Sequence, residues 1–517
     1  MAEKSIQATL EEYFHHKSFR TGQEEIIEAI VNRRDCLAVM ATGGGKSLCY
    51  QLPALMLEGM TIVISPLIAL MKDQVDNLSR QGVYVETLNS MQTYDERKRV
   101  EADILAGRVR ILYVSPERAT LPQFVTLLAR TRVSLIAVDE AHCISMWGHQ
   151  FRPEYRGLKN LREKLGDVPV AAFTATATTR VREDIKTQLA LKNPAEFIGS
   201  FDRKNLYYAA VEEPSQKVRT QKIISYVLAH RDTSGIIYCF SRTATEDLAA
   251  ELRRAHILAN AYHAGLPTPE RNRIQEAFLN NSTRVICATI AFGMGIDKPD
   301  VGFVIHAHMP RDIESYYQET GRAGRGGARS ECILFYSKGD QYKIRRMIES
   351  DTMPVQQREV ALEKLSQMYN YCTAKNCRRQ VLLSYFGEEI NTCKNCDICR
   401  KTPAPGAVSA APSAAASAAP KAAKAPAGIS RTILYAVRDV DGLLTRQEFI
   451  SFLLGLDRAK TKTLNLTSNR YFGAAKGMER EDLERIVAEF LIAGRLILKG
   501  NTVKKICPGA YKRPREG

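Results

Sequence analysis

The hydrophobic pattern of the chain first predicts a set of buried parallel strands. Runs that are apolar at nearly every position recur at residues 36–40, 61–65, 110–114, 135–138 and 170–173. Strands that are covered by helices on both faces have this continuous apolar pattern. The connections between the runs are long enough for crossover helices, for example over residues 67–80 and 179–191. We therefore expect a doubly wound α/β domain, which we place at residues 1–211 with a helical lead-in over residues 1–34.

A second series of the same kind follows the first. Its apolar runs lie at residues 235–240, 259–263, 284–288, 302–306 and 332–336. This series predicts a second α/β domain over residues 212–350. Two α/β domains in tandem leave a cleft between them.

The pattern changes beyond residue 350. Residues 354–386 are helical in periodicity, so we expect a helical module over residues 351–400. Residues 401–428 are almost wholly Ala, Pro, Ser and Lys and predict a linker. Helical periodicity returns at residues 429–440, 445–454 and 480–493, and residues 494–506 predict a β-hairpin that turns at Gly500 and Asn501. Three helices and a hairpin predict a winged-helix domain over residues 429–517.

Composition and charge indicate which kinds of binding partner to expect. No run of 18 apolar residues occurs, so no contact with a membrane is expected. The formal net charge is +16, and residues 401–517 hold 20 Lys and Arg against 10 Asp and Glu. A basic C-terminal module favours a polyanionic partner, although a merely solvated surface is the alternative. Of the 12 cysteines, eight are scattered singly, and we expect a reducing compartment.

A glycine-rich run after the first strand predicts a nucleotide site. It consists of Thr42, Gly43, Gly44, Gly45, Lys46 and Ser47, and a helical pattern follows it. Backbone N–H groups of such a loop surround phosphate oxygens, and the helix N-terminus adds its positive end. Lys46 is expected to reach the β- and γ-phosphates and Ser47 to bind Mg²⁺. Met40 stands where a strict P-loop has glycine.

Two further runs complete the predicted site. Asp139 and Glu140 follow the strand at residues 135–138, at the sheet edge where ligands gather. We expect Asp139 to hold Mg²⁺ and Glu140 to polarise the attacking water. Arg322 and Arg325 come from the second α/β domain and are expected to offset charge on the γ-phosphate. On its own, an Arg-Ala-Gly-Arg run is more often a nucleic-acid-binding or solvated patch.

Together these runs resemble the RecQ helicases of helicase superfamily 2. The matching segments are residues 19–23, 42–47, 65–74, 139–149, 151–155, 174–177, 291–296 and 315–325. The resemblance covers about residues 10–400. It implies two tandem RecA-like domains, then a helical zinc-binding module and a winged helix.

The resemblance also implies roles for single residues. Arg20 and Gln23 resemble the family's adenine-reading pair, and His16 stands where an aromatic ring often stacks on the base. Gln318 resembles a residue that contacts water or the γ-phosphate, Arg325 an arginine finger, and Arg322 its companion. The residues that resemble couplers between ATP and DNA are His142, Thr174 and Thr176.

Trp147 is the only tryptophan, and it lies in a segment that resembles the family's aromatic-rich loop. A lone tryptophan is usually a core residue, but Gly148 and Pro153 favour a loop. We expect Trp147 and Phe151 to meet DNA bases and Arg152 to meet phosphate.

Four clustered cysteines predict a metal site. Cys393, Cys396 and Cys399 are separated by two residues each, and Cys377 lies 16 positions before Cys393. Four thiolates satisfy tetrahedral Zn²⁺ and leave no open position, so the zinc is expected to be structural. Cys372 is a competing ligand, and an iron–sulfur cluster is the alternative. The resemblance places the family's zinc site on the first four.

These features predict an ATP- and Mg²⁺-dependent DNA helicase. By resemblance it moves 3′ to 5′ and unwinds duplex, forked or branched DNA in recombination and repair. We expect a monomer in the bacterial cytoplasm near the nucleoid, with the nucleus as the alternative, and a single-strand-binding protein is a candidate partner. The rival functions are an RNA helicase and a non-catalytic DNA-binding scaffold.

Overall fold

The computed structural model describes residues 5–89, 91–148, 150–293, 298–400, 429–440, 443–456, 459–480, 482–484, 486–487, 496–499 and 502–505. The chain divides into two compact units. One comprises Met1–Pro214, Thr233–Ala250 and Leu258–Arg400, and the other Ser215–Asp232, Glu251–Ile257 and Lys401–Gly517. The predicted linker at residues 401–428 lies outside the described residues.

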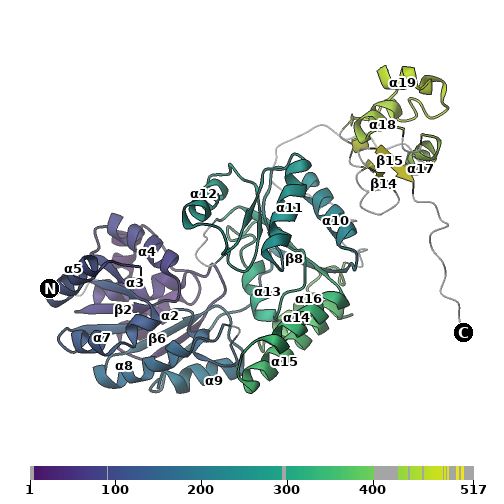
Figure 1. Cartoon of the computed structure of the whole chain (residues 1–517). Helices are drawn as coiled ribbons and strands as arrows, with labels where there is room; N and C mark the ends of the chain where they lie inside the picture. The colour runs from purple at the N-terminus through teal and green to yellow at the C-terminus, as the bar shows by residue number, and fades with distance from the viewer. Residues whose placement is uncertain are drawn as a thin grey trace, which may run out of the picture. The chain divides into compact units, whose positions relative to one another are not determined.

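The first lobe is built on a seven-stranded parallel sheet with strand order β3-β4-β2-β5-β6-β1-β7 (Figure 1). Its strands are β1 (Cys36–Val39), β2 (Met60–Ile64), β3 (Val85–Leu88), β4 (Ile111–Val114), β5 (Val133–Val138), β6 (Val170–Thr174) and β7 (Ala195–Ile198). Every residue of β1, β2, β4, β5 and β6 is buried, which explains their continuous apolar pattern. The sequence did not predict β3 and β7. They are the two edge strands, and partly exposed positions interrupt their apolar pattern.

Helices cover both faces of this sheet, as expected for a doubly wound domain. They are α1 (Ile6–Phe14), α2 (Gln23–Val31), α3 (Lys46–Met56), α4 (Ile68–Arg80), α5 (Tyr94–Leu105), α6 (Pro116–Ala119), α7 (Pro122–Leu128), α8 (Leu158–Leu165) and α9 (Thr179–Gln188). Buried residues of α2, α3 and α4 form one apolar cluster with the sheet. Those of α5, α7, α8 and α9 belong to a separate cluster, which contains the alternate strand positions.

The second lobe has a six-stranded parallel sheet with strand order β10-β11-β9-β12-β13-β8. Its strands are β8 (Leu206–Glu212), β9 (Ser234–Tyr238), β10 (Ala259–Tyr262), β11 (Val285–Ala288), β12 (Val301–His306) and β13 (Ser330–Tyr336). The helices in this part of the chain are α10 (Gln216–Ala229), α11 (Arg242–Arg254), α12 (Thr268–Leu279), α13 (Ile313–Thr320) and α14 (Lys338–Ser350). The predicted boundary after residue 211 falls inside β8, because the chain already joins the second sheet through this unpredicted edge strand.

The predicted helical module contains α15 (Val355–Thr373) and α16 (Arg378–Tyr385). Further along, α17 (Ile429–Asp439), α18 (Arg446–Leu453) and α19 (Ala459–Thr463) precede the antiparallel pair β14 (Leu496–Lys499) and β15 (Thr502–Lys505). Of the predicted helix at residues 480–493, the described positions are helical, and the predicted hairpin turn at residues 500–501 lies outside the described part. These elements are consistent with the expected winged helix.

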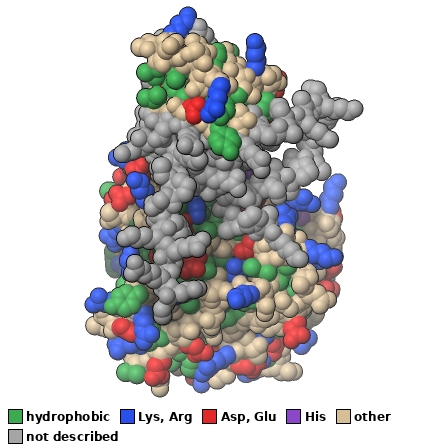
Figure 2. All heavy atoms as spheres, turned by 90° about the vertical axis from the view of Figure 1, so that its right-hand side faces the viewer, with side chains coloured by type: hydrophobic (Ala, Val, Ile, Leu, Met, Phe, Trp, Pro, Cys, Tyr) green, Lys and Arg blue, Asp and Glu red, His purple; other side chains and the backbone are tan. Residues whose placement is uncertain are grey.

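The surface carries charges of both signs. Figure 2 shows basic and acidic side chains interspersed on the visible face. Among the helices that the structure describes, none combines the length and apolar character needed to cross a bilayer.

Candidate active site and zinc centre

The glycine-rich loop joins β1 to α3 and borders a cavity of about 1140 Å³. This cavity brings together predicted residues that are far apart in the sequence. It is lined by Arg20, Gln23, Thr42, Gly43, Gly45, Lys46, Ser47, Asp139, Glu140 and Arg325, among others. The second lobe therefore contributes to the same cavity as the P-loop of the first.

The loop has the backbone shape that a phosphate cradle requires. Gly43 and Gly45 have φ of 84° and 80°, which favours glycine. A Cβ atom added at Gly44 would lie 2.9 Å from the carbonyl oxygen of Ala41. The hydroxyl of Thr42 is buried without a hydrogen-bond partner among the described residues. An orphan hydroxyl beside a helix N-terminus and Lys46 fits an anionic ligand such as a nucleotide phosphate.

Arg20 and Gln23 hold this loop directly. Arg20 Nη1 donates a hydrogen bond of 2.6 Å to the carbonyl of Gly43. Gln23 Nε2 donates to the carbonyls of Gly44 and Gly45 at 3.3 and 3.2 Å. The same Gln23 side chain accepts from the Arg20 backbone N–H at 2.8 Å. The pair thus braces the P-loop, and its predicted contact with adenine stays a prediction.

Asp139 and Glu140 follow β5 directly, at the carboxyl edge of the sheet. Asp139 is buried, and burial together with the charge of Glu140 raises its pKa above the usual range. For Glu140, burial raises the pKa, but the hydrogen bond and charge of His142, together with the charges of Lys46 and Arg322, outweigh burial and hold the pKa below the usual range. The two neighbouring carboxyls are therefore electrostatically different, and Glu140 is the more strongly ionised.

A chain of polar contacts runs from Glu140 to the second lobe. His142 Nδ1 lies 3.3 Å from Glu140 Oε2 and 2.9 Å from Thr174 Oγ1. Thr174 Oγ1 in turn accepts from the backbone N–H of Thr176 at 3.2 Å. Gln318 Nε2, on α13, donates to Thr176 Oγ1 at 3.2 Å. The residues predicted to couple ATP and DNA are thus in contact with one another.

The two predicted arginines lie in the turns that follow α13 rather than on a helix. Arg325 packs against the P-loop, since its Cγ would be 3.6 Å from a Cβ added at Gly43. The Arg322 side chain is buried and donates to the carbonyl of Gly293. Its positive charge also helps to lower the pKa of Glu140. Arg325 therefore lines the cavity, whereas Arg322 is buried and is not among the lining residues.

Arg203 is a site residue that sequence reasoning missed. It lies between β7 and β8, in the connector formed by residues 199–205. Its Nη1 donates to the P-loop carbonyl of Thr42 at 3.2 Å and to the carbonyl of Gly321 at 3.3 Å. Its Nη2 donates to the carbonyls of Ala323 and Gly324, both at 3.0 Å. One guanidinium thus ties the P-loop to the segment that contains Arg322.

The predicted aromatic-rich loop lies close to the sheet edge. Trp147 is half-buried, and the guanidinium carbon of Arg180 is 3.0 Å from the centroid of its ring. Phe151 is also half-buried. Arg152 Nη1 donates to the carbonyl of Pro66 at 3.5 Å and lies 3.8 Å from a Glu117 carboxylate oxygen. The loop is neither fully in the core nor fully exposed, and its predicted contact with DNA remains a prediction.

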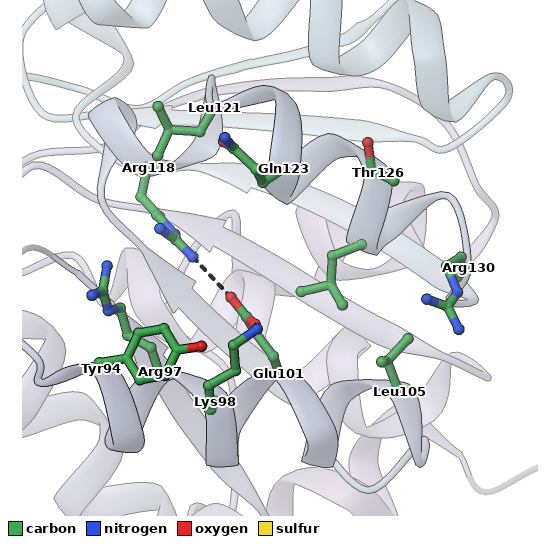
Figure 3. Close-up of a pocket in the computed structure, with 11 residues that line it drawn as sticks. Tyr94, Arg97, Lys98, Glu101, Leu105, Arg118, Leu121, Gln123, Thr126 and Arg130 are labelled. Carbon is green, nitrogen blue, oxygen red and sulfur yellow. Dashed lines mark hydrogen bonds and ion pairs between the residues drawn. The ribbon is translucent and has the colours of Figure 1, made fainter.

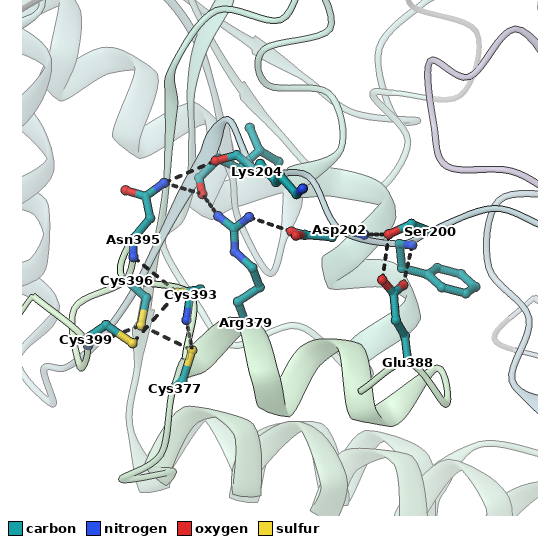
Figure 4. A network of polar contacts seen from close by, with 12 residues as sticks. Ser200, Asp202, Lys204, Cys377, Arg379, Glu388, Cys393, Asn395, Cys396 and Cys399 are labelled. Atoms are coloured by element: carbon teal, nitrogen blue, oxygen red, sulfur yellow. Dashed lines mark hydrogen bonds and ion pairs between the residues drawn. The ribbon is translucent and has the colours of Figure 1, made fainter. Parts of the chain in front are cut away.

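The four predicted cysteines come together beside α16 (Figure 4). The Sγ atoms of Cys377, Cys393, Cys396 and Cys399 all lie within 4.8 Å of one another. Two Sγ–Sγ distances are 3.9 and 4.0 Å. A tetrahedral site with Zn–S bonds of about 2.3 Å has edges of about 3.8 Å. The donor set fits structural Zn²⁺, and Cys372 is not part of the cluster.

Contacts from the zinc module hold the connector that contains Arg203. Arg379, on α16, donates to Asp202 Oδ1 at 2.6 Å and also to the carbonyl of Leu206. Glu388 accepts from Ser200 Oγ and from the backbone N–H of Phe201, both at 2.6 Å (Figure 4). The module thus fixes both ends of the connector between the two sheets.

Family comparisons match the first lobe, the second lobe and the zinc module separately. The DEAD/DEAH box helicase family matches residues 20–185, and the helicase conserved C-terminal domain matches residues 218–327. The RecQ zinc-binding family matches residues 338–400. The last match includes all four clustered cysteines.

Curated relatives share much of this sequence. The ATP-dependent DNA helicase RecQ of Haemophilus influenzae is 48% identical over 398 residues, which cover 77% of this chain and 64% of that protein. The protein of the same name from Bacillus subtilis is 43% identical over 401 residues, covering 77% of this chain and 67% of that protein. The matched part of this chain thus spans about two thirds of the length of these relatives.

A solved structure of low sequence identity resembles this chain in its fold. The helicase Lhr of Mycobacterium smegmatis, bound to single-stranded DNA and AMP-PNP, matches with a TM-score of 0.52 and 21% identity over 66% of this chain and 49% of that one. The two parallel-sheet lobes, the cysteine cluster, the family matches and the relatives agree. The chain belongs to the RecQ family of helicases.

Proposed function

We propose that this protein is an ATP- and Mg²⁺-dependent DNA helicase. The observation that carries the proposal is that one cavity contains Lys46, Ser47, Asp139 and Glu140 of the first lobe and Arg325 of the second. A nucleotide that binds there is contacted by both lobes. Its hydrolysis can therefore change how the lobes hold each other, as a motor requires.

Each residue has a distinct task in this proposal. Lys46 and the P-loop N–H groups bind phosphate oxygens, and Ser47 and Asp139 hold Mg²⁺. Glu140, kept ionised by His142, orients the attacking water. Arg325 offsets the charge that develops on the transferred phosphoryl group. Mg²⁺ held by Ser47 and Asp139 would supply positive charge that offsets the negative charge of the phosphates.

Arg203 acts as a positioning residue in the same cycle. It bonds both the Thr42 carbonyl and the main chain on either side of Arg322. A change in the P-loop is thereby passed to the arginine-bearing segment through one rigid guanidinium. The contact chain from Glu140 to Gln318 provides a second route between the lobes.

DNA is the favoured substrate, with the aromatic-rich loop at residues 147–155 as its sensor. Half-buried Trp147 and Phe151 offer ring faces for stacking, and Arg152 offers a cation for phosphate. The relatives' names support DNA over RNA. We further propose 3′-to-5′ unwinding of duplex, forked or branched DNA in recombination and repair. The proposal includes a monomeric state, a single-strand-binding protein as partner, and action at the bacterial nucleoid.

The fold does not by itself separate DNA from RNA. A structure of Mss116p with single-stranded RNA and AMP-PNP matches at a TM-score of 0.55 and 16% identity, covering 74% of this chain and 88% of that one. ATP hydrolysis should therefore be measured with single-stranded DNA and with RNA of the same length and sequence. We expect stronger stimulation by DNA, and stronger stimulation by RNA would overturn the choice of substrate.

The catalytic assignment is tested with Lys46→Ala. Loss of the phosphate-binding cation should lower ATP hydrolysis at least about 100-fold, because transition-state charge is no longer offset. Binding of a fluorescent single-stranded oligonucleotide should remain measurable. Unchanged hydrolysis in this variant would refute the site. Retained DNA binding without any hydrolysis by the unaltered protein would support a scaffold instead.

A further inference from the structure

A second hollow lies on the first lobe between α5 on one side and α6 and α7 on the other (Figure 3). Its volume is about 650 Å³, and it shares no lining residue with the nucleotide cavity. We name it the α5–α7 groove. It is lined by Tyr94, Arg97, Lys98, Glu101, Leu105, Arg118, Leu121, Gln123, Thr126, Leu127 and Arg130.

The charge of the α5–α7 groove is strongly positive. Four of its lining residues are cationic and only Glu101 is acidic. Glu101 is already bonded by Lys98 at 3.2 Å and by Arg118 at 3.1 Å. Arg97 and Arg130 have no ion-pair partner in the part of the chain that the structure describes. These two cations therefore remain available to a negatively charged ligand.

The uncharged lining consists of three leucines together with Tyr94, Gln123 and Thr126. Leu105 and Leu121 are 42% and 38% exposed, and Leu127 is half-buried. In Figure 3, Leu105 and Arg130 lie at one end of the groove, with Tyr94, Arg97 and Leu121 toward the other. Apolar contact area and unpaired cations thus occur together along the groove.

We propose that the α5–α7 groove binds a short acidic segment of a partner protein. Carboxylates of the segment pair with Arg97 and Arg130, and its apolar side chains cover Leu105, Leu121 and Leu127. Since α5 has 12 residues and each rises about 1.5 Å, the groove accommodates about five extended residues. The site is independent of the proposed helicase activity.

Charge and chemistry favour this occupant over two others. Bases of a nucleic acid stack on aromatic rings, and Tyr94 is the one aromatic side chain among the residues that line the groove. Segments of this chain outside the described residues are poorly matched, because residues 401–428 contain three lysines and no acidic residue. Residues 506–517 contain three basic residues and one acidic residue.

The test uses random peptides of about eight residues displayed on phage. The full chain serves as bait after the library has been depleted on the double variant Arg97→Glu/Arg130→Glu. The matched control is Lys159→Glu/Lys164→Glu, which makes the same charge change at exposed positions of α8. We expect enrichment of peptides that combine Asp or Glu with apolar residues. A labelled enriched peptide should bind the groove variant at least about tenfold more weakly than it binds the control variant.

Three outcomes would overturn the proposal. The first is a selection that enriches no acidic sequence. The second is an enriched peptide that binds the groove variant and the control variant equally well. The third is a labelled oligothymidylate that loses as much affinity for the groove variant as the peptide does, which would make the groove part of a nucleic-acid path. ATP hydrolysis without DNA should be unchanged in both variants, since neither alters the nucleotide cavity.

Discussion

At the scale of single residues, the best evidence for a working site is the contact between lobes. Arg325 packs on Gly43, and Gln318 bonds Thr176. The sequence predicted these residues because each lies in a short run of characteristic chemistry. It could not predict Arg203, whose partners are main-chain carbonyls scattered over 282 positions from Thr42 to Gly324. Backbone acceptors leave no side-chain signal in a sequence.

Replacement of Arg203 tests the tie between the lobes. Arg203→Gln removes the charge and the fork of donors, so we expect the kcat of DNA-stimulated ATP hydrolysis to fall about 10- to 100-fold through misplacement of the arginine-bearing segment. The affinity for nucleotide should change little, because Lys46 and the P-loop remain. Arg203→Lys should recover only part of the rate, since one ammonium cannot bond four carbonyls at once. Equal loss of kcat and of nucleotide affinity would point to a folding defect instead.

Trp147 provides a second residue test. Trp147→Ala removes the ring that Arg180 stacks on and that we expect to meet DNA. DNA-stimulated hydrolysis should fall about tenfold or more, while hydrolysis without DNA stays near its original value. Trp147→Phe keeps a ring and should retain most of the stimulation. Full stimulation in the alanine variant would assign Trp147 to packing alone.

At the scale of elements, the zinc module matters because it holds the connector between β7 and β8. Cys393, Cys396 and Cys399 were predictable from their spacing, and the resemblance to the family selected Cys377 rather than Cys372 as the fourth ligand of a tetrahedral ion. Its attachment to the connector was not predictable. Arg379 and Asp202 are 177 positions apart, and nothing in either run marks the other.

Loss of zinc should therefore loosen the connector. We expect Cys396→Ser to reduce bound zinc from about one ion per chain, lower the midpoint of thermal unfolding and expose residues 199–205 to protease. Elemental analysis, calorimetry and mass mapping of the cleavage sites measure these effects. Cys372→Ala is the control, because Cys372 is buried outside the cluster and should leave the zinc content intact. A zinc-depleted protein with an equally protected connector would contradict the proposed attachment.

The strands missed by the sequence, β3, β7 and β8, all lie at sheet edges. Partly exposed positions interrupt the apolar pattern of β3 and β7, whereas β8 is buried at five of its seven positions. The interior strands were predicted within a few residues because burial on both faces leaves little choice of side chain. In a strand of only four residues, the alternation of apolar and polar positions is too short to distinguish an edge strand from a loop.

At the scale of the whole molecule, charge is unevenly divided along the chain. Residues 401–517 carry 20 of the Lys and Arg residues against 10 acidic ones, and β15 ends on Lys504 and Lys505. We expect Lys504→Gln/Lys505→Gln to weaken duplex DNA binding. The slope of log affinity against log salt concentration should become shallower by up to about 0.9 for each lost phosphate contact.

The matched control for this experiment is Lys159→Gln/Lys164→Gln on α8. It removes the same charge from the first lobe, so an equal change in slope would show that net charge alone matters. Hydrolysis stimulated by short single strands should be normal in both variants, because the nucleotide cavity and the aromatic-rich loop are untouched.

The bonding of Arg203 has a consequence for how this protein can vary. All four of its acceptors are peptide oxygens, which every amino acid possesses. Substitution at Thr42, Gly321, Ala323 or Gly324 therefore cannot delete an acceptor and can only displace it. The contacts of Arg203 therefore tolerate substitution at the four residues that accept its hydrogen bonds. They are lost when Arg203 itself is replaced.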